Sequence, residues 1–261
     1  MSSIRGLPVF LLALLSHLAI AQAQDSALDT SIIADNLEDT YDRCLIAAQQ
    51  DPEVGMDMAL RWKRLTGGEP SEHCQAVALM SLGDTEEGAS RLEQLADQSS
   101  ATAPVRSGLY SQAARGWMDI AEYGRALSAL NKSAALSNKD VEVLLDRAVT
   151  YAALEDYWSA VDDLNLVLDL SPNAFDALVL RGSAYRKLDI KDLAADDIDR
   201  VLAAEPNNID ALLESGLLAR DRGDKTAARL AWVRILELAS DSATADAVRN
   251  HIQEMDIRQD P

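Results

Sequence analysis

The residues best able to do chemistry in this sequence are two cysteines, three histidines and several pairs of aspartates. Cys44 and Cys74 could form a disulfide or remain as two buried thiols, because they lack the C-x-x-C spacing of a redox-active pair. A disulfide here would close a loop of about 30 residues and stabilise the fold by about 3–4 kcal/mol. The pair is therefore a candidate for a structural bond and not for catalysis.

The histidines and aspartates give little support for an active site. His73 and His251 belong to no catalytic or zinc-binding motif, so we interpret them as packing or solvent-exposed side chains. Asp162-Asp163 and Asp196-Asp197 are the residue types of a glycosidase or calcium site, but the same pair recurs one repeat later and lacks the calcium-loop pattern. We expect both aspartate pairs to lie on a solvated face. We predict no catalytic residue, no metal and no cofactor.

The charge of the chain restricts its partners. The formal net charge is −19, from 43 acidic and 24 basic residues. Such a surface repels the phosphates of nucleic acids and of anionic lipids. The acidic surface can serve solubility alone, or it can attract a basic partner, and the composition leaves both interpretations open.

The N-terminus has the pattern of an export signal. Arg5 precedes an apolar segment from Val9 to Ala21, and the small residues Ala21 and Ala23 predict cleavage before Gln24. An uncleaved anchor is the less favoured alternative, because the apolar segment is shorter than the roughly 20 residues of a membrane span. No later segment is long and apolar enough to span a membrane. We expect a periplasmic protein without stable membrane insertion after cleavage.

A 34-residue repeat organises most of the remaining chain. Small residues recur at Ala114, Ala148, Gly182 and Gly216, aromatic residues at Trp117, Tyr151 and Tyr185, alanines at Ala126, Ala160, Ala194 and Ala228, and larger apolar residues at Leu130, Leu164, Ile198 and Trp232. In the unit 175–208, Leu178, Gly182 and Tyr185 form one helical stripe, and Pro206 stops the second helix. One helix pair cannot bury both of its faces, so neighbouring pairs must stack.

These columns resemble the tetratricopeptide repeat, a family built from 34-residue antiparallel helix pairs. The resemblance covers residues 107–240 and implies an all-α, right-handed α-solenoid of antiparallel helix pairs with a C-terminal capping helix. Arg147 and Arg181 stand where the family often has leucine, and Ala219 replaces the aromatic residue, so the last unit is expected to be looser.

The chain is expected to have five parts. They are a signal peptide at 1–23, a disordered linker at 24–34, two degenerate helix-hairpin repeats at 35–106, four regular units at 107–140, 141–174, 175–208 and 209–242, and a capping helix with a tail at 243–261. Both cysteines then fall in first helices of successive hairpins, which pack side by side. Ala245, Val248, Ile252 and Met255 form the apolar stripe of the capping helix.

In this family the first helices line a concave groove, so the resemblance implies a binding surface at their inward positions. The candidate groove residues are Arg115, Met118, Leu145, Val149, Val179, Ser183, Arg186, Lys187, Leu213, Leu217 and Arg220. Apolar residues with scattered cations suit an extended or helical peptide that has apolar anchors and some acidic groups. Equally, Val149, Val179 and Leu213 can simply pack between neighbouring helices.

Taken together, these features predict a non-enzymatic scaffold in the periplasm that binds a peptide or partner protein in its groove. A self-associating structural or regulatory subunit of an envelope complex is the alternative. A carbohydrate-active enzyme that uses paired carboxylates is the least favoured of the three hypotheses.

Overall fold

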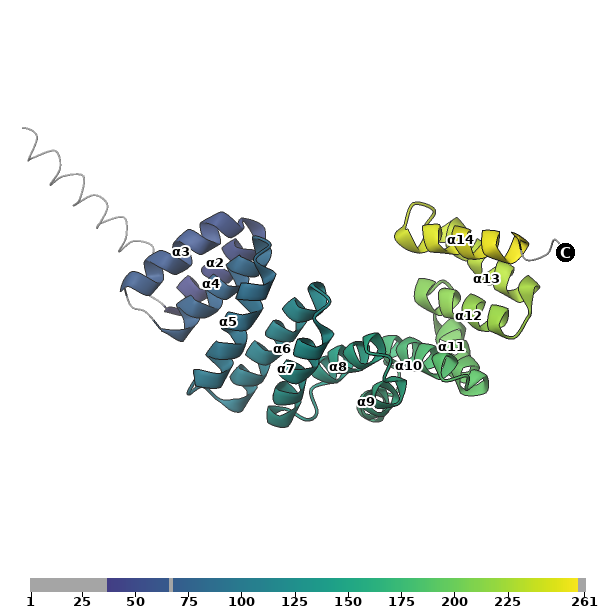
Figure 1. Cartoon of the computed structure of the whole chain (residues 1–261), viewed down its shortest axis with the longest axis horizontal. Coiled ribbons are helices and arrows are strands. Elements are labelled where there is room, and N and C mark those ends of the chain that lie inside the picture. The colour runs from purple at the N-terminus through teal and green to yellow at the C-terminus, as the bar shows by residue number, and fades with distance from the viewer. Residues whose placement is uncertain (1–36, 66–67, 258–261) are drawn as a thin grey trace, which may run out of the picture. The chain divides into compact units, whose positions relative to one another are not determined.

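The computed structural model describes residues 37–65 and 68–257, and the predicted signal peptide and linker lie outside them (Figure 1). The described residues form thirteen helices and no strand, which confirms the predicted all-α class. None of these helices combines the length and apolar character needed to cross a membrane. The chain divides into two compact units between Ser100 and Ala101.

Unit 1 consists of two helix pairs. Its helices are α2 (Leu37–Gln50), α3 (Pro52–Leu65), α4 (Glu69–Ser81) and α5 (Thr85–Gln98). Pro52 begins α3, a position where proline is tolerated because the first N–H groups of a helix have no intrahelical partner. The cluster between α2, α3 and α4 has small side chains, including Ala48, Ala59 and Ala78, around the ring of Trp62, and Tyr41 packs against it.

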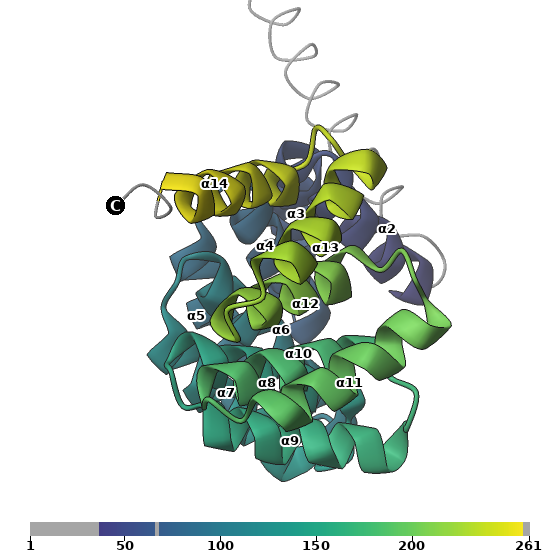
Figure 2. The ribbon, with the colours of Figure 1, turned by 90° about the vertical axis from the view of Figure 1, so that its right-hand side faces the viewer.

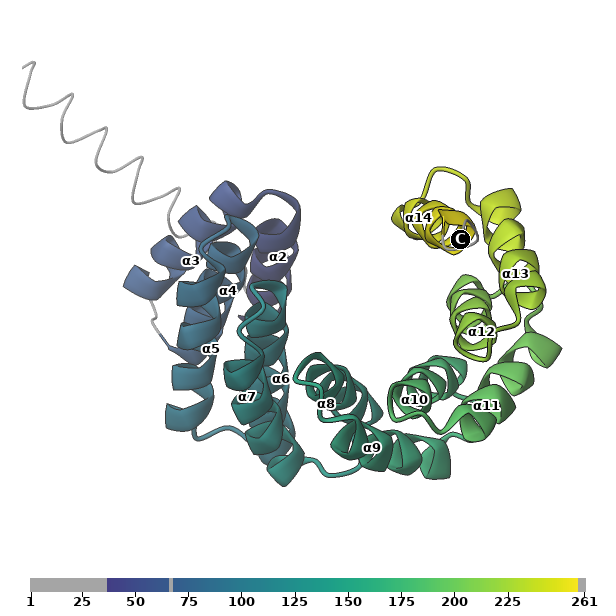
Figure 3. The same cartoon turned by 45° about the vertical axis from the view of Figure 1, so that its right-hand side comes forward.

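Unit 2 continues the pattern of helix pairs. Its helices are α6 (Ala103–Asp119), α7 (Tyr123–Leu136), α8 (Val141–Ala153), α9 (Tyr157–Leu170), α10 (Phe175–Lys187), α11 (Lys191–Ala204), α12 (Ile209–Asp221), α13 (Lys225–Leu238) and α14 (Ala243–Ile257). The first helices α8, α10 and α12 lie in one layer, and the second helices α9, α11 and α13 lie in the other (Figure 3). Helix α6 begins before Ser107, the expected start of the first regular unit.

Complementary side-chain sizes hold the two layers of unit 2 together. Gly216 on α12 faces the indole ring of Trp232 on α13, and a Cβ built on Gly216 would lie 2.1 Å from the indole nitrogen. A Cβ built on Gly182 would lie 3.0 Å from Ile198, a milder contact. The column of small residues therefore exists because each first helix must approach the large residue of its second helix closely.

The turn inside each pair of unit 2 uses a left-handed backbone conformation at the same place. The φ angle is 60° at Ala121, 61° at Glu155, 62° at Asp189 and 83° at Gly223, and each of these residues lies one repeat after the previous one. Only glycine adopts this conformation without a steric penalty from Cβ. The residue types in this column differ, so the sequence pattern did not reveal it.

The last helix, α14, closes the apolar core of unit 2. It is the yellow helix of Figure 2, and it packs against α13. Val248 and Met255 join a buried cluster with Leu217, Trp232 and Ile235. Most of its exposed residues, including Arg249 and Asn250, are polar, and Ile257 at its end is an exposed apolar residue. The predicted capping helix is therefore present.

Candidate functional site

Arginines that hold buried carboxylates connect three successive helix pairs of unit 2, from α6/α7 to α10/α11. Arg181 on α10 donates two hydrogen bonds to the carboxylate of Asp197 on α11, at 2.8 and 2.7 Å, and a third to Asn165 on α9, at 2.6 Å. Arg147 on α8 makes the same three bonds, to Asp163 on α9 and to Asn131 on α7. Each arginine thus joins both helices of its own unit to the second helix of the preceding unit.

These bridges correct the prediction that both aspartate pairs lie on a solvated face. Asp163 and Asp197 are 4% and 3% exposed, while Asp162 and Asp196 do point to solvent. The physical reason is the arginine at the position where the family often has leucine, because a guanidinium placed there needs a carboxylate partner. The hydrogen bond to Asp197 is the largest factor in raising the pKa of Arg181, and burial opposes it.

The same bridges weaken the hypothesis of a carbohydrate-active enzyme. Each buried carboxylate already accepts two arginine hydrogen bonds, whereas a glycosidase needs two carboxyl groups that face a common substrate. Within residues 37–65 and 68–257, no group of three or more His, Cys, Asp and Glu side chains is placed to hold a metal ion.

The predicted groove residues all lie on the first helices of unit 2. Arg115 and Met118 are on α6, Leu145 and Val149 on α8, Val179, Ser183, Arg186 and Lys187 on α10, and Leu213, Leu217 and Arg220 on α12. Val179 and Leu217 are buried in the hydrophobic core, so they pack between helices. Val149 is exposed, and Leu145 and Leu213 are half-buried.

Two of the four predicted groove cations are already neutralised by carboxylates of the next first helix. Arg115 pairs with Asp146 at 2.8 Å and with Glu142 at 3.0 Å, both on α8. Arg186 pairs with Glu214 at 2.8 Å and Asp221 at 3.3 Å, both on α12. These ion pairs count against the expectation that the arginines bind acidic groups of a ligand.

Arg186 shows how strongly such a pair is held. Its side chain is only 9% exposed, and burial acts to lower the pKa of the guanidinium. The hydrogen bonds and negative charges of Glu214 and Asp221 more than offset burial, so the pKa of Arg186 is raised. Arg220 pairs with the adjacent Asp221, whereas Lys187 is exposed and has no ion-pair partner among the described residues.

A surface hollow of about 320 Å³ lies between α10 and α12. Its apolar residues are Val179, Leu180 and Leu213, and its polar residues are Asp176, Ser183, Asp210 and Glu214. Asp176 and Asp210 occupy inward positions of the repeat but were not among the candidate residues. Their inward positions were the signal that could have found them. They were left out because an acidic residue in the first turn of a helix is ordinarily explained by the helix dipole.

Comparison with known proteins identifies the fold. No protein-family model and no curated protein matches the sequence. Among solved structures, YrrB, described as a TPR protein with an unusual peptide-binding site, is 15% identical, with 74% of this chain and 97% of that chain covered and a TM-score of 0.56. The chain has the tetratricopeptide-repeat fold.

Two further structures agree with this assignment. MamA from Desulfovibrio magneticus RS-1 is 18% identical, with 66% of this chain and 94% of that chain covered and a TM-score of 0.56. The APC/C hetero-tetramer Cut9-Hcn1 is 15% identical, with 87% of this chain and 45% of that chain covered and a TM-score of 0.62. At these identities the likeness shows the tetratricopeptide fold alone.

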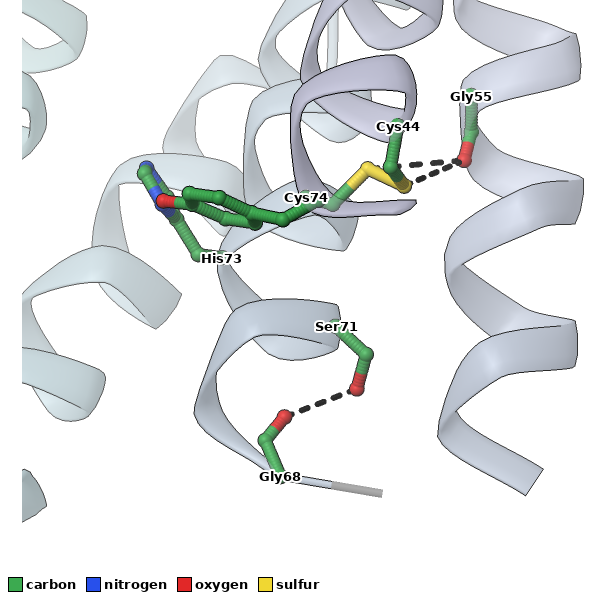
Figure 4. The surroundings of a disulfide bond; sticks show 7 residues. Cys44, Gly55, Gly68, Ser71, His73 and Cys74 are labelled. Atoms are coloured by element: carbon green, nitrogen blue, oxygen red, sulfur yellow. Dashed lines mark hydrogen bonds between the residues drawn. A yellow bond between two sulfur atoms is a disulfide. The ribbon is translucent and has the colours of Figure 1, made fainter. Parts of the chain in front are cut away.

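In unit 1, the predicted disulfide between Cys44 and Cys74 is present. It joins α2 to α4, the first helices of successive pairs, with a Cα–Cα distance of 6.0 Å. Figure 4 shows the carbonyl oxygen of Gly55 on α3 facing the bond, 3.8 and 3.9 Å from the two sulfur atoms. Both cysteines are fully buried, so the bond is placed to stabilise the repeat and is shielded from solvent.

The two histidines of the described chain are packing residues. His73 is buried beside the disulfide, and its Nδ1 is hydrogen-bonded to the hydroxyl of Tyr41. Burial, and then the charge of Asp42, raises the pKa of Tyr41. His251 stacks on Trp232 with ring centroids 5.3 Å apart, so it secures the capping helix of the tetratricopeptide array.

Proposed function

We propose that this protein is a non-enzymatic scaffold that binds an extended peptide or a partner protein on the first-helix face of unit 2. The hollow between α10 and α12 carries this proposal, because it is a concave surface with apolar residues and a few polar groups, the composition of a recognition site. The half-buried Leu145 and exposed Val149 on α8 add apolar surface to the same layer of helices. The peptide-binding site named for YrrB supports this use of the fold.

We also propose that the scaffold acts in the periplasm. The N-terminal pattern of Arg5 followed by the apolar segment 9–21 is typical of an export signal. A disulfide is expected to persist in an oxidising compartment and to be rare in the cytosol, so the Cys44–Cys74 bond supports the same location.

Self-association is the second candidate function, because the outer layer of unit 2 has exposed apolar side chains. Leu230 on α13 is 75% exposed and, with Val233, lines a hollow of about 560 Å³. An exposed apolar patch of this kind is a common feature of contact surfaces. The mostly polar outer surface of α14 counts against growth of the array from its end.

Site-directed photo-crosslinking in cells separates the two candidates. A photoreactive amino acid replaces Val149 or Lys187 on the first-helix layer, and Trp158 or Leu230 on the outer layer, in the full chain with a C-terminal tag. All four side chains are exposed, so the substitutions should preserve the fold. The proposal expects one discrete heterologous product from positions 149 and 187 and none from the outer pair.

Two results would contradict the proposed scaffold. A product seen only from positions 158 and 230, at the mass of a dimer, would instead establish self-association. Heterologous products from the outer positions alone would show that the binding surface lies on the second helices and not on the first. An Arg186→Glu variant is a poor probe, because it would place a third carboxylate beside Glu214 and Asp221 in a largely buried setting.

A further inference from the structure

We infer that the hollow between α10 and α12 receives an apolar side chain of a peptide whose neighbouring residues are basic. This inference rests on the proposed binding role of the first-helix face and specifies the chemistry of the ligand. The charges around the hollow indicate that the ligand is basic. The apolar residues that line it indicate that the anchoring side chain is apolar.

The lining has an apolar part that suits one aliphatic side chain. Val179 belongs to the core cluster around α10, and Leu180 packs against the same cluster. Leu213 packs against the neighbouring cluster around α12. Because these residues are held by the two cores, the apolar surface is already formed without a ligand, which reduces the entropy lost on binding.

The charged part of the lining is entirely negative. It contains the carboxylates of Asp176, Asp210 and Glu214 and no cationic side chain. Arg186 neutralises Glu214, but neither Asp176 nor Asp210 has an ion-pair partner within the described residues, and both are exposed. Two unpaired carboxylates beside an apolar surface are complementary to Lys or Arg on either side of an apolar anchor.

The preceding helix pair differs from α10 and α12 because the carboxylate at its equivalent position is already paired. Glu142 on α8 occupies the position of the repeat equivalent to Asp176 and Asp210, one repeat before Asp176. Arg115 neutralises Glu142 at 3.0 Å and also holds Asp146 at 2.8 Å. Among these three equivalent positions, the carboxylate is therefore left unbalanced only on α10 and α12.

An acidic ligand fits this surface poorly. Arg115 and Arg186, which the sequence suggested as anchors for acidic groups, already hold carboxylates, so an acidic peptide would have to displace them. The net charge of −19 adds long-range attraction for basic peptides and repulsion for acidic ones. The charge of the whole chain and the local charge of the hollow thus favour the same class of ligand.

Three synthetic peptides provide the test. Each is a capped, fluorescent nonapeptide with a central leucine, and the residues on both sides are lysine, glutamine or glutamate. Affinity is measured by fluorescence anisotropy with the purified full chain, and the site is located from NMR shifts of the Val179, Leu180 and Leu213 methyl groups. We expect the lysine peptide to bind best and its affinity to fall as salt is added.

Charge-neutralising variants test whether Asp176 and Asp210 recognise the basic residues of the peptide. Asp176→Asn combined with Asp210→Asn should weaken the lysine peptide by about fivefold to tenfold, the size expected for two exposed ion pairs. Asp162→Asn combined with Asp196→Asn is the matched control, because it removes the same charge from two exposed, repeat-equivalent positions on the second helices. The control should bind the lysine peptide as the unmodified chain does.

The outcomes distinguish this inference from the proposed function. Equal or tighter binding of the glutamate peptide at the same methyl groups would refute the charge preference and leave the scaffold intact. An equal loss of affinity in both double variants would also refute it, because only general charge would then matter. If no peptide shifts these methyl groups, the hollow is not the site, and crosslinks from positions 149 and 187 decide the proposed function separately.

Discussion

Unit 1 joins its two helix pairs through a covalent bond, whereas unit 2 joins three of its pairs through arginines at equivalent positions of the repeat. In unit 1 the Cys44–Cys74 bond connects the first helices α2 and α4 across a core of small side chains. In unit 2 Arg147 and Arg181 connect three helices each, beside a continuous apolar core. In this chain the less regular repeats carry a covalent cross-link, whereas the regular repeats are joined by packing and by hydrogen bonds to buried carboxylates.

Loss of the disulfide should have the largest effect, and only in unit 1. Replacing Cys44 and Cys74 by alanine should destabilise α2–α5 by about 3–4 kcal/mol, because the bond constrains the unfolded chain across its loop. Hydrogen exchange measured helix by helix should show faster exchange in unit 1 and unchanged exchange in α8–α13. A reductant should reproduce the effect in the natural chain and add nothing to the variant. Equal destabilisation of both units would show that the disulfide does not act on unit 1 alone.

An arginine bridge should come next in size. Arg181→Leu restores the residue type common in the family but leaves Asp197 buried without its partner, so unit 2 should lose about 3 kcal/mol. Adding Asp197→Leu should recover most of that loss, because a buried ion pair can often be replaced by apolar residues. Chemical denaturation of the three chains measures both steps. If the single variant is as stable as the natural chain, the bridges do not join the repeats.

These two connections differ in how far the sequence could predict them. The cysteines were found because their even number and their place in successive first helices indicate a disulfide. The arginine bridge was missed because its residues come from two successive repeat units. In addition, Asp162-Asp163 resembles an exposed acidic pair in the sequence, which does not show that Asp163 lies on the buried face of its helix. The 34-residue columns predicted the fold. The acidic character of the hollow depends on which charges are already paired, and one sequence does not show that pairing.

The glycines of the small-residue column, Gly182 and Gly216, test how closely the two helices of each pair in unit 2 must approach. Gly216→Ala places a Cβ against the rigid ring of Trp232 and should cost about 2 kcal/mol through overpacking. Gly182→Ala is the matched control and should cost clearly less, because Ile198 can move by a few tenths of an ångström. Thermal unfolding of the two variants measures the difference. Equal losses would mean that helix separation is not set by the facing side chain.

A smaller change should stabilise the protein. Glu155 has a φ angle of 61°, so Glu155→Gly removes steric strain at the turn between α8 and α9 and should raise stability by about 0.5–1 kcal/mol. Gly223→Ala at the equivalent turn between α12 and α13 should lower stability by a similar amount. Denaturation midpoints of both variants provide the measurement. The two stability changes must have opposite signs. Loss of stability in both variants would show that the side chain of Glu155 makes a stabilising contribution larger than the strain of its backbone conformation.

The smallest expected effect is a pH dependence of stability that comes from His251. Burial, then the charge of Arg220, lowers the pKa of His251 below 6.5, with Arg186 acting in the same direction and Glu254 opposing. The unfolded chain therefore binds the proton more readily, so the stability from the neutral ring is complete above about pH 6.5 and is lost as pH falls through the folded pKa.

This loss should be confined to the end of unit 2, where the ring of His251 stacks on Trp232 and its Nδ1 has no hydrogen-bond partner among the described residues. Hydrogen exchange of α14 at pH 7.5 and 5.5 should show faster opening at the lower pH in the natural chain. His251→Gln should remove that difference, because glutamine does not titrate, while the helices of unit 1 respond identically in both chains. An unchanged pH response of α14 in the glutamine variant would assign the effect to the carboxylates of the array and not to the histidine.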